Sequence, residues 1–592
     1  MNRRERRAAA RKSSAKPGGR STETLDVLYQ TAVGHRGAGR SLDAQLSCQH
    51  ALQIDGTHAD SLHLMGLLLC DAGQYDHAVQ WIARAVKQTI KPEYLFSLGQ
   101  ALRQHGRRDE ALLAFRHVLN LEPAHWDAAQ ESGGLLHESG RLQEALDVLK
   151  PCLEARPDHV RTVVACTECM LSLRQFEEVV AINQRAHVLD PGNADRCNSV
   201  AVALQLLGRQ DEALPWFDRA IALQPDFIDA LNNKAVALSN LRRFEEACAT
   251  YDRVKVIDPG NVGAEWNLAL LQMLTGNFEA GWAGREAYWK TDRHSTYPKF
   301  SQPRWFGEAG IEGKTILVCA DEGLGDTIQF ARYVPLVASR GARVILAVEE
   351  AARALLSELP GASQCVRKSA NDLPAFDMHC PMSGLPSAFG TRLDTIPSEV
   401  PYLPAPPQHL VQAWSHRLGP HDKLRVGLVW SGNPQHGNDH NRSIPLRALL
   451  PLLDLDATFV SLQKDPRPAD REVLTQRGDI VDLTAHLTDF VETAALIGCL
   501  DLVITVDTSV AHLAGALGRP TWILLPYTPD YRWLLDRDDS PWYPTMRLFR
   551  QSETREYTSV LDRVRSELKG LISARQLENW RERRDSNPRP PP

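Results

Sequence analysis

Small residues return at a fixed spacing through the first half of the chain. They lie 33 or 34 residues apart in one series, which comprises Ala32, Gly66, Gly99, Gly133, Thr167, Ala201, Ala235 and Ala269. A second series begins twelve residues later at Ala44, and a third begins seven residues beyond that at Ala51. This period predicts two antiparallel helices per repeat, because small side chains let neighbouring helices approach closely. Prolines 34 residues apart, from Pro123 to Pro259, would end the second helix of a repeat.

This pattern resembles the tetratricopeptide repeat, with eight copies over residues 25–291. Stacked copies form an all-α solenoid with a concave groove. The resemblance implies a protein or peptide partner in that groove, bound by side chains other than the small packing residues. The fifth copy departs most from the pattern, with Thr167, Val179 and Asn183, and we expect a weak or bent point there.

From Lys314 onward the pattern changes to short apolar runs separated by helical stretches. The runs are 315–320, 342–349, 425–430, 458–463, 501–506 and 521–526. Strands that alternate with helices predict an α/β region with parallel sheets covered on both faces. A Pro-rich stretch at 396–408 divides this region into two Rossmann-like domains, 310–405 and 423–545. We expect a terminal helix within 546–580.

Positive charge is concentrated at the N-terminus. The first 20 residues hold eight Lys and Arg and one Glu, whereas the whole chain carries a net charge of −6. The acidic remainder argues against nucleic-acid binding. We expect residues 1–24 to be a disordered, solvated leader and residues 581–592 a disordered tail. The alternative for the leader is peripheral contact with anionic lipid or RNA.

The chain shows no segment that predicts membrane insertion or export. No apolar run approaches the roughly 18 residues that span a bilayer, and the basic N-terminus lacks the apolar stretch of a secretory signal. The expected location is therefore the cytoplasm.

Four motifs of the second half occur in the order of a known enzyme family. They are ADEGLGDTIQFARYVP (320–335), RVGLVWSGNPQHGNDHNRSIPL (425–446), DLVITVDTSVAHLAGALGRPTWILLP (501–526) and PDYRWLLDRDDSPWYPTMRLFRQ (529–551). Together they resemble the bacterial heptosyltransferase-like glycosyltransferases of family 9, which have the GT-B fold, over about residues 280–570. Joined to tetratricopeptide repeats, they resemble bacterial repeat-bearing glycosyltransferases and, more distantly, the O-linked N-acetylglucosamine transferases. The resemblance implies transfer of a sugar from a nucleotide-sugar donor.

The third motif places short polar side chains at the end of a predicted strand. Asp507, Thr508 and Ser509 follow the run 501–506, and a helix is expected to begin near Ser509. Free N–H groups at a helix N-terminus attract a diphosphate. By resemblance Asp507, Thr508 and His512 contact the nucleotide-sugar donor. The alternative is an ordinary helix cap, as in any strand-to-helix turn.

The loop after the first strand of the second domain offers phosphate ligands. Gly432 and Gly437 would let the backbone approach a ligand closely, and Asn433 lies between them. Arg442 presents a planar fork of donors, and the family carries a basic residue here that binds donor phosphate. The alternative is a solvated loop arginine. Lys464, which follows Gln463 at the end of another strand, is a further phosphate candidate.

The GLGD segment of the first motif holds the candidate catalytic residue. By resemblance Asp326 faces the acceptor and is the general base that removes the acceptor hydroxyl proton. Glu322 is a nearby alternative, and a purely structural role for Asp326 would be to cap a helix that begins near Thr327.

No metal site or cofactor is expected. The two D-x-D patterns, 454–456 and 536–538, do not lie at predicted strand ends, and His436 and His440 lack a third ligand. A helix dipole and positive side chains would neutralise the leaving diphosphate instead.

The hypothesis that combines these observations is a cytoplasmic, metal-independent, inverting glycosyltransferase whose repeats recruit a protein acceptor. Two alternatives stay open. One is a non-catalytic repeat scaffold whose second half senses a nucleotide sugar. The other is a transferase that acts on a lipid-linked glycan.

Overall fold

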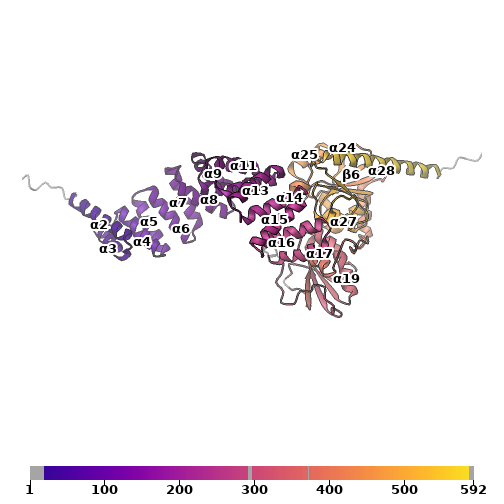
Figure 1. Ribbon diagram of the computed structural model, residues 1–592, viewed down its shortest axis with the longest axis horizontal. Helices are drawn as coiled ribbons and strands as arrows, with labels where there is room; N and C mark the ends of the chain where they lie inside the picture. Colours follow the sequence, from indigo (N-terminus) through magenta and orange to yellow (C-terminus); the bar gives the residue numbers. More distant parts are fainter. Residues whose placement is uncertain (1–18, 291–296, 371, 586–592) are drawn as a thin grey trace, which may run out of the picture. The chain divides into compact units, whose positions relative to one another are not determined.

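The computed structural model describes residues 19–290, 297–370 and 372–585 (Figure 1). Most of the expected leader, 1–18, and the end of the expected tail, 586–592, lie outside the described residues. The expected end of the leader, residue 24, and the expected start of the tail, residue 581, were wrong. Helix α2 (Gly19–Gly37) already includes residues 19–24, and helix α28 (Thr558–Asp585) includes residues 581–585. In both places an adjoining helix continues, because each added residue completes one more backbone hydrogen bond.

Eight antiparallel helix pairs occupy the predicted repeats. After α2 they comprise α3 (Ser41–Ile54), α4 (Ala59–Asp71), α5 (Tyr75–Gln88), α6 (Pro92–Gln104), α7 (Arg108–Leu121), α8 (Trp126–Glu138), α9 (Leu142–Ala155), α10 (Val160–Ser172), α11 (Phe176–Leu189), α12 (Ala194–Leu206), α13 (Gln210–Leu223), α14 (Ile228–Asn240), α15 (Phe244–Ile257), α16 (Val262–Leu274) and α17 (Phe278–Arg285). Pro123 and its counterparts lie two residues beyond the end of a second helix, as predicted.

Two compact units divide the chain between Pro225 and Asp226. The first six repeats lie in the first unit. Repeats seven and eight, α14 to α17, lie in the second unit together with both sheets. The last two repeats are thus built into the body of the α/β region.

The small residues of the repeats lie where the two helices of a pair cross. A Cβ on Gly66 would fall 2.3 Å from Ile82, and one on Gly99 would fall 2.5 Å from the Phe115 ring. In each pair the larger side chain follows the small one by sixteen residues. The predicted packing role of the small series is confirmed.

The fifth repeat fills the same crossing with a polar pair. Asn183, which is buried, donates a hydrogen bond from Nδ2 to Thr167 Oγ1 at 2.8 Å and another to the Val179 carbonyl at 3.0 Å. Because both bonds satisfy the buried amide, this departure from the pattern closes the crossing without leaving a polar group unpaired.

Replacing Gly99 by alanine is expected to destabilise the third repeat. The new methyl group would overlap the buried Phe115 ring, and overpacking of this kind costs about 1–3 kcal/mol. Gly134→Ala in helix α8 is the matched control, because no atom lies within 4 Å of its Cβ position. That change should stabilise the chain by about 0.5–1 kcal/mol through helix propensity. Urea unfolding of the two variants checks the opposite signs; equal stability would contradict the packing account.

Two parallel sheets form the second half. The first has the strand order β3-β2-β1-β4 and the second the order β10-β9-β8-β5-β6-β7. Their strands are β1 (Thr315–Cys319), β2 (Arg343–Val348), β3 (Ala362–Arg367), β4 (Met378–Pro381), β5 (Arg425–Val429), β6 (Thr458–Ser461), β7 (Ile480–Val481), β8 (Leu502–Val506), β9 (Thr521–Leu525) and β10 (Met546–Arg550). Each of the six predicted runs contains one of these strands.

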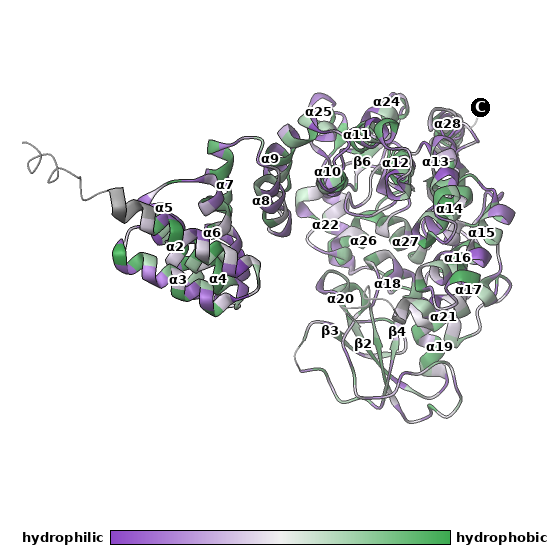
Figure 2. Ribbon diagram, turned by 60° about the vertical axis from the view of Figure 1, so that its left-hand side comes forward, coloured by the Kyte–Doolittle hydropathy of each residue, from purple (hydrophilic) through white to green (hydrophobic). Residues whose placement is uncertain are grey.

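Helices connect and cover the strands (Figure 2). They are α18 (Leu324–Phe330), α19 (Val334–Ser339), α20 (Glu350–Leu356), α21 (Leu385–Ala388), α22 (Gln408–Leu418), α23 (Asp439–Arg442), α24 (Leu446–Leu453), α25 (Pro468–Gln476), α26 (Phe490–Gly498) and α27 (Ser509–Ala516). The Pro-rich linker runs without regular structure up to α22. Residues 546–550, expected in the terminal helix, form strand β10 instead, because they pair with β9. The terminal helix begins only at Thr558.

One hydrophobic core joins the two sheets and the last repeat. It contains Ile316 and Val318 of β1, Val503 of β8, and Phe278 and Trp282 of α17. Within the described part of the chain, no helix combines the length and the apolar character needed to cross a membrane.

Candidate active site

The carboxyl ends of β1 and β8 bring the two predicted motifs together. Helix α18, which follows β1, packs against helix α27, which follows β8. Gly325 makes this contact possible, because a Cβ there would lie 2.9 Å from the His512 ring and 3.6 Å from the Ser509 Cα. The second glycine of GLGD, Gly325, therefore lets helices α18 and α27 approach closely. It places Asp326 in the neighbourhood of Asp507 and the residues that follow it.

Arg532 links the two halves of the site. It lies in the short helix η6 (Tyr531–Trp533) after β9 and is 8% exposed. Its guanidinium donates to Asp530 Oδ1 at 2.7 Å, to Gln329 Oε1 at 2.6 Å and, in a short contact, to Asp326 Oδ1. Sequence reasoning did not single out Arg532, although it lies within the fourth motif.

Asp326 has both of its oxygens engaged. Oδ1 pairs with Arg532, and Oδ2 accepts a hydrogen bond from the Gly323 N–H at 3.0 Å. Helix α18 begins at Leu324 rather than near Thr327, and Asp326 caps it from inside its first turn. The structural role considered for Asp326 is thus present. Its role as a base stays a prediction, which the geometry permits because each carboxylate oxygen keeps a second lone pair.

Two more carboxyl groups belong to the same segment as Asp326: Asp321, which is buried, and Glu322, which is partly buried. Glu322 forms an ion pair with Arg285, which comes from helix α17 of repeat eight and also donates to the Tyr531 hydroxyl at 3.0 Å. Burial raises the pKa of Glu322, against the opposing effect of Arg285. Asp321 accepts hydrogen bonds from the N–H of Ser383, at 3.0 Å, and from its hydroxyl. Glu322 is therefore tied to the repeats, and Asp321 to the first sheet.

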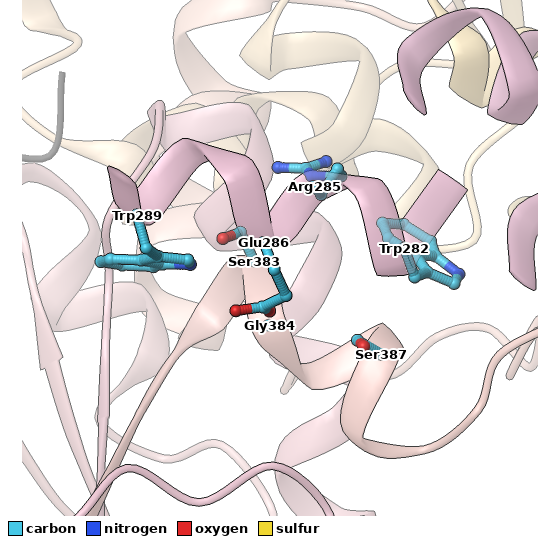
Figure 3. Close-up of a pocket in the computed structure, with 7 residues that line it drawn as sticks. All are labelled: Trp282, Arg285, Glu286, Trp289, Ser383, Gly384 and Ser387. Atoms are coloured by element: carbon cyan, nitrogen blue, oxygen red, sulfur yellow. The ribbon is translucent and has the colours of Figure 1, made fainter. Parts of the chain in front are cut away.

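A small pocket lies between Arg285 and Ser383 (Figure 3). Its walls come from α17 and the short helix η1 (Glu286–Lys290) on one side and from the segment after β4 on the other. The lining residues are Trp282, Arg285, Glu286, Trp289, Ser383, Gly384 and Ser387. Arg285 and Ser383, the partners of Glu322 and Asp321, both line it, so the pocket lies behind the carboxylates.

Asp321→Asn is expected to change how stability depends on pH. Burial and the neighbouring Glu322 carboxylate raise the pKa of Asp321 to about 7, whereas an unfolded aspartate titrates near about 3.9. Between these values the folded state binds more protons, so the stability that Asp321 contributes is complete below about pH 4 and is lost as the pH rises through about 7. Asparagine does not titrate, so its advantage over aspartate should grow from pH 5 to pH 8. Urea unfolding at both pH values measures this difference; a constant difference would show that Asp321 is not held protonated.

Arg442 reaches Asp507 from the loop after β5. Its Nη1 donates to the Asp507 carbonyl at 3.1 Å, and its buried Nε has no hydrogen-bond partner in the described part of the chain. The loop is held by Ser443, whose Oγ accepts from the Gly432 N–H at 3.0 Å and donates to Asp439 at 2.6 Å. An ordered loop therefore aims a guanidinium, with a spare donor, at the end of β8.

Asp507, which is partly buried, and His512, which is buried, have opposite pKa shifts. Burial and the charge of Asp530 raise the pKa of Asp507 to about 6. Burial and Arg532 lower the pKa of His512 to about 3, so the imidazole is neutral near pH 7. Its Nδ1 lies 2.9 Å from the Tyr543 hydroxyl, its Nε2 lies 4.0 Å from Asp507 Oδ1, and its ring stacks on Trp533. The neutral imidazole of His512 is thus held in place by Tyr543 and Trp533 at one side of the site.

The remaining predicted residues divide into two groups. Thr508 stands at the N-cap of α27 but makes no side-chain capping bond, and Ser509 is the first residue of that helix. Both lie beside Asp507. Asn433 and Lys464 are exposed, and the Asn433 side chain accepts a bond from the Gln435 N–H within its own loop. Gln463 is buried and accepts from the N–H groups of Trp430 and Ser431.

No cluster of three or more His, Cys, Asp or Glu side chains that could hold a metal ion occurs among the described residues. The D-x-D aspartates serve surface contacts instead. Asp454 pairs with Arg477, and Asp536 pairs with Arg242.

Comparison with known proteins gives matches in both halves. The model of glycosyltransferase family 9 (heptosyltransferase) matches residues 461–561, and tetratricopeptide-repeat models match 92–125, 193–224 and 216–249. Protein FlbA of Caulobacter vibrioides is 24% identical over 609 residues, which cover 93% of this chain and 98% of FlbA.

Two solved structures are similar to the repeats. The crystal structure of MamA protein covers 28% of this chain and 92% of its own, with 18% identity and a TM-score of 0.27. The structure of YrrB, a TPR protein with an unusual peptide-binding site, covers 32% of this chain and 97% of its own, with 20% identity and a TM-score of 0.29. The family models thus match tetratricopeptide repeats in the first half of the chain and glycosyltransferase family 9 in its C-terminal part.

Proposed function

From tetratricopeptide repeats joined to a glycosyltransferase family 9 domain, we propose that this protein transfers a sugar from a nucleotide-sugar donor to a protein acceptor, with inversion and without a metal ion. The observation that carries the proposal is the convergence of Arg442 and Asp507 at the carboxyl end of the second sheet. Asp507 lies inside the segment that matches the family, and the carboxyl edge of a parallel sheet is where open α/β folds bind ligands.

The donor diphosphate would lie at the N-terminus of α27. The first N–H groups of that helix, near Thr508 and Ser509, receive no side-chain cap from Thr508, so they would donate to phosphate oxygens. Arg442 adds a positive charge and the unpartnered Nε beside them. Both features stabilise negative charge that develops on the leaving diphosphate.

Transfer would proceed by direct displacement. The acceptor hydroxyl oxygen attacks the anomeric carbon and forms the new C–O bond, while its proton passes to the Asp326 carboxylate. The bond between the anomeric carbon and the phosphate oxygen breaks, and the nucleoside diphosphate leaves with that electron pair. A single displacement of this kind inverts the anomeric configuration.

The repeats would supply the acceptor. Side chains of successive repeats contact one another along their first helices, as between His63 and Ser97 at 2.9 Å and between Asp60 and Lys91 at 2.8 Å. A stacked array of polar side chains of this kind suits an extended peptide, whose backbone needs a hydrogen-bond partner at each step. A protein acceptor is therefore favoured over a lipid-linked glycan.

The proposal is tested by the release of nucleoside diphosphate from a panel of nucleotide sugars, with and without a chelator. We expect one sugar nucleotide to be turned over at the same rate with and without chelator, and nuclear magnetic resonance to show a product of inverted configuration. Loss of turnover with the chelator would contradict metal independence. A product of retained configuration would contradict direct displacement.

A further inference from the structure

The loop after β9, residues 527–536, forms one side of the candidate donor site. Asp530 and Arg532 belong to this loop, and Trp533 stacks on His512 with ring centroids 5.5 Å apart. Arg532 also carries the ion pair to Asp326. The position of this loop therefore decides where several groups of the site lie. The donor role of this loop rests on the proposed nucleotide-sugar function of that site.

Repeat seven holds this loop from outside. Arg242, in the turn between α14 and α15, donates from Nε to the Tyr527 carbonyl at 3.1 Å and from Nη1 to Asp536 Oδ1 at 2.9 Å. Its guanidinium lies 4.1 Å from the centre of the Tyr527 ring. The Thr528 hydroxyl donates to the Asn240 carbonyl at 2.9 Å. The turn of a repeat thus contacts both ends of the loop.

The backbone of Arg242 is in the left-handed region, which an arginine rarely adopts. Its φ angle is +59°, whereas the same turn position in six other repeats is a glycine with φ between +72° and +92°. The one other exception is Arg174 of repeat five, also at +59°. Glycine adopts this region without a steric penalty, and arginine does not. The contacts of its side chain with the loop give Arg242 a role that glycine could not fill.

We infer that Arg242 is a positioning residue for the donor, and that repeat seven sets donor affinity by fixing loop 527–536. A loop that is already held in its binding shape loses less conformational entropy when a ligand binds. Release of the Arg242 contacts would remove no group that takes part in the chemistry, but it would loosen the loop that carries Asp530, Arg532 and Trp533.

Arg242→Gly in the full-length protein tests this inference, with Arg174→Gly as its matched control. Both changes remove the same side chain and relieve the same backbone conformation, but Arg174 lies over Phe176 within its own repeat. We expect Arg242→Gly to raise amide hydrogen exchange in residues 527–536 and to weaken nucleoside diphosphate binding by about tenfold, with little change in kcat. Arg174→Gly should change neither. Arg242→Lys, which keeps the charge toward Asp536 but loses the fork, should fall between them.

The binding probes are UDP, GDP, ADP and dTDP, titrated into each variant by calorimetry. If the wild-type protein binds a nucleotide and Arg242→Gly binds it equally well, the inference is wrong and the proposed function stands. If the wild-type protein binds none of the probes, both the inference about Arg242 and the proposed nucleotide-sugar function are wrong. Unchanged exchange of the loop in Arg242→Gly would overturn the positioning role whatever the titrations show.

Discussion

Replacing Asp326 by asparagine is expected to slow sugar transfer by about 10²–10⁴-fold, the range typical of a positioned general base. Asparagine has the same size and keeps an oxygen that can accept from the Gly323 N–H or from Arg532, but it does not accept the acceptor proton. Donor affinity should change much less than the rate, because the proposed phosphate ligands lie on the other sheet. Steady-state kinetics with the turned-over nucleotide sugar measures both quantities.

Asp530→Asn is the matched control for this variant. Asp530 is a second carboxylate on the same guanidinium, 2.7 Å from Arg532 Nη1, so its replacement removes an ion pair of the same kind without touching the base. Its rate should fall much less than that of Asp326→Asn. Equal losses would mean that Asp326 acts only by holding Arg532. If Glu322→Gln abolishes transfer while Asp326→Asn transfers sugar at a rate near that of the wild type, the general base is Glu322.

Cutting the chain before residue 291 is expected to abolish folding of the transferase half, whereas cutting it before residue 226 should not. Residues 226–290 place Phe278 and Trp282 in the core shared by the two sheets, and Trp282 Nε1 donates to the Thr391 carbonyl at 2.9 Å. Removing each of these large side chains loses its burial against the core, which is worth about 1.5–3 kcal/mol. Loss of Arg285 would leave Glu322 with only the longer ion pair to Arg532, at 4.0 Å, and breaking a buried ion pair costs up to about 3–5 kcal/mol.

These costs together approach the whole stability of a typical domain, about 5–15 kcal/mol. Thermal unfolding followed by near-ultraviolet circular dichroism distinguishes the two fragments, 226–592 and 291–592. A cooperative transition at the same temperature in both would show that repeats seven and eight are an independent attachment.

The repeats and the main strands were predictable because their signals are local. A period of 34 residues fixes the helix pairs, and continuous apolar runs mark strands buried on both faces, such as β8. Strand β3 was missed because it lies at the edge of its sheet and because the exposed polar residues Ser363 and Gln364 interrupt its apolar residues. Strand β10 was missed because charged Arg547 and Arg550 interrupt its apolar residues.

The site was predictable only where it follows a strand end. Asp507 and Arg442 are located by the strands before them. The arginines that organise the carboxylates were not found, because their partners are distant in the sequence. Arg532 meets Asp326 across 206 positions, and Arg285 meets Tyr531 across 246. No spacing rule connects such pairs; only the packing of α17, α18 and η6 does.

A nucleotide sugar is expected to bind at the carboxyl end of the second sheet. The most direct test is calorimetric titration of the full-length protein with a panel of nucleotide sugars. We expect saturable binding at one site per chain, with the bound nucleotide sugar displaced by the matching nucleoside diphosphate but not by the free sugar. Absence of binding by every nucleotide sugar, or displacement by the sugar alone, would contradict it.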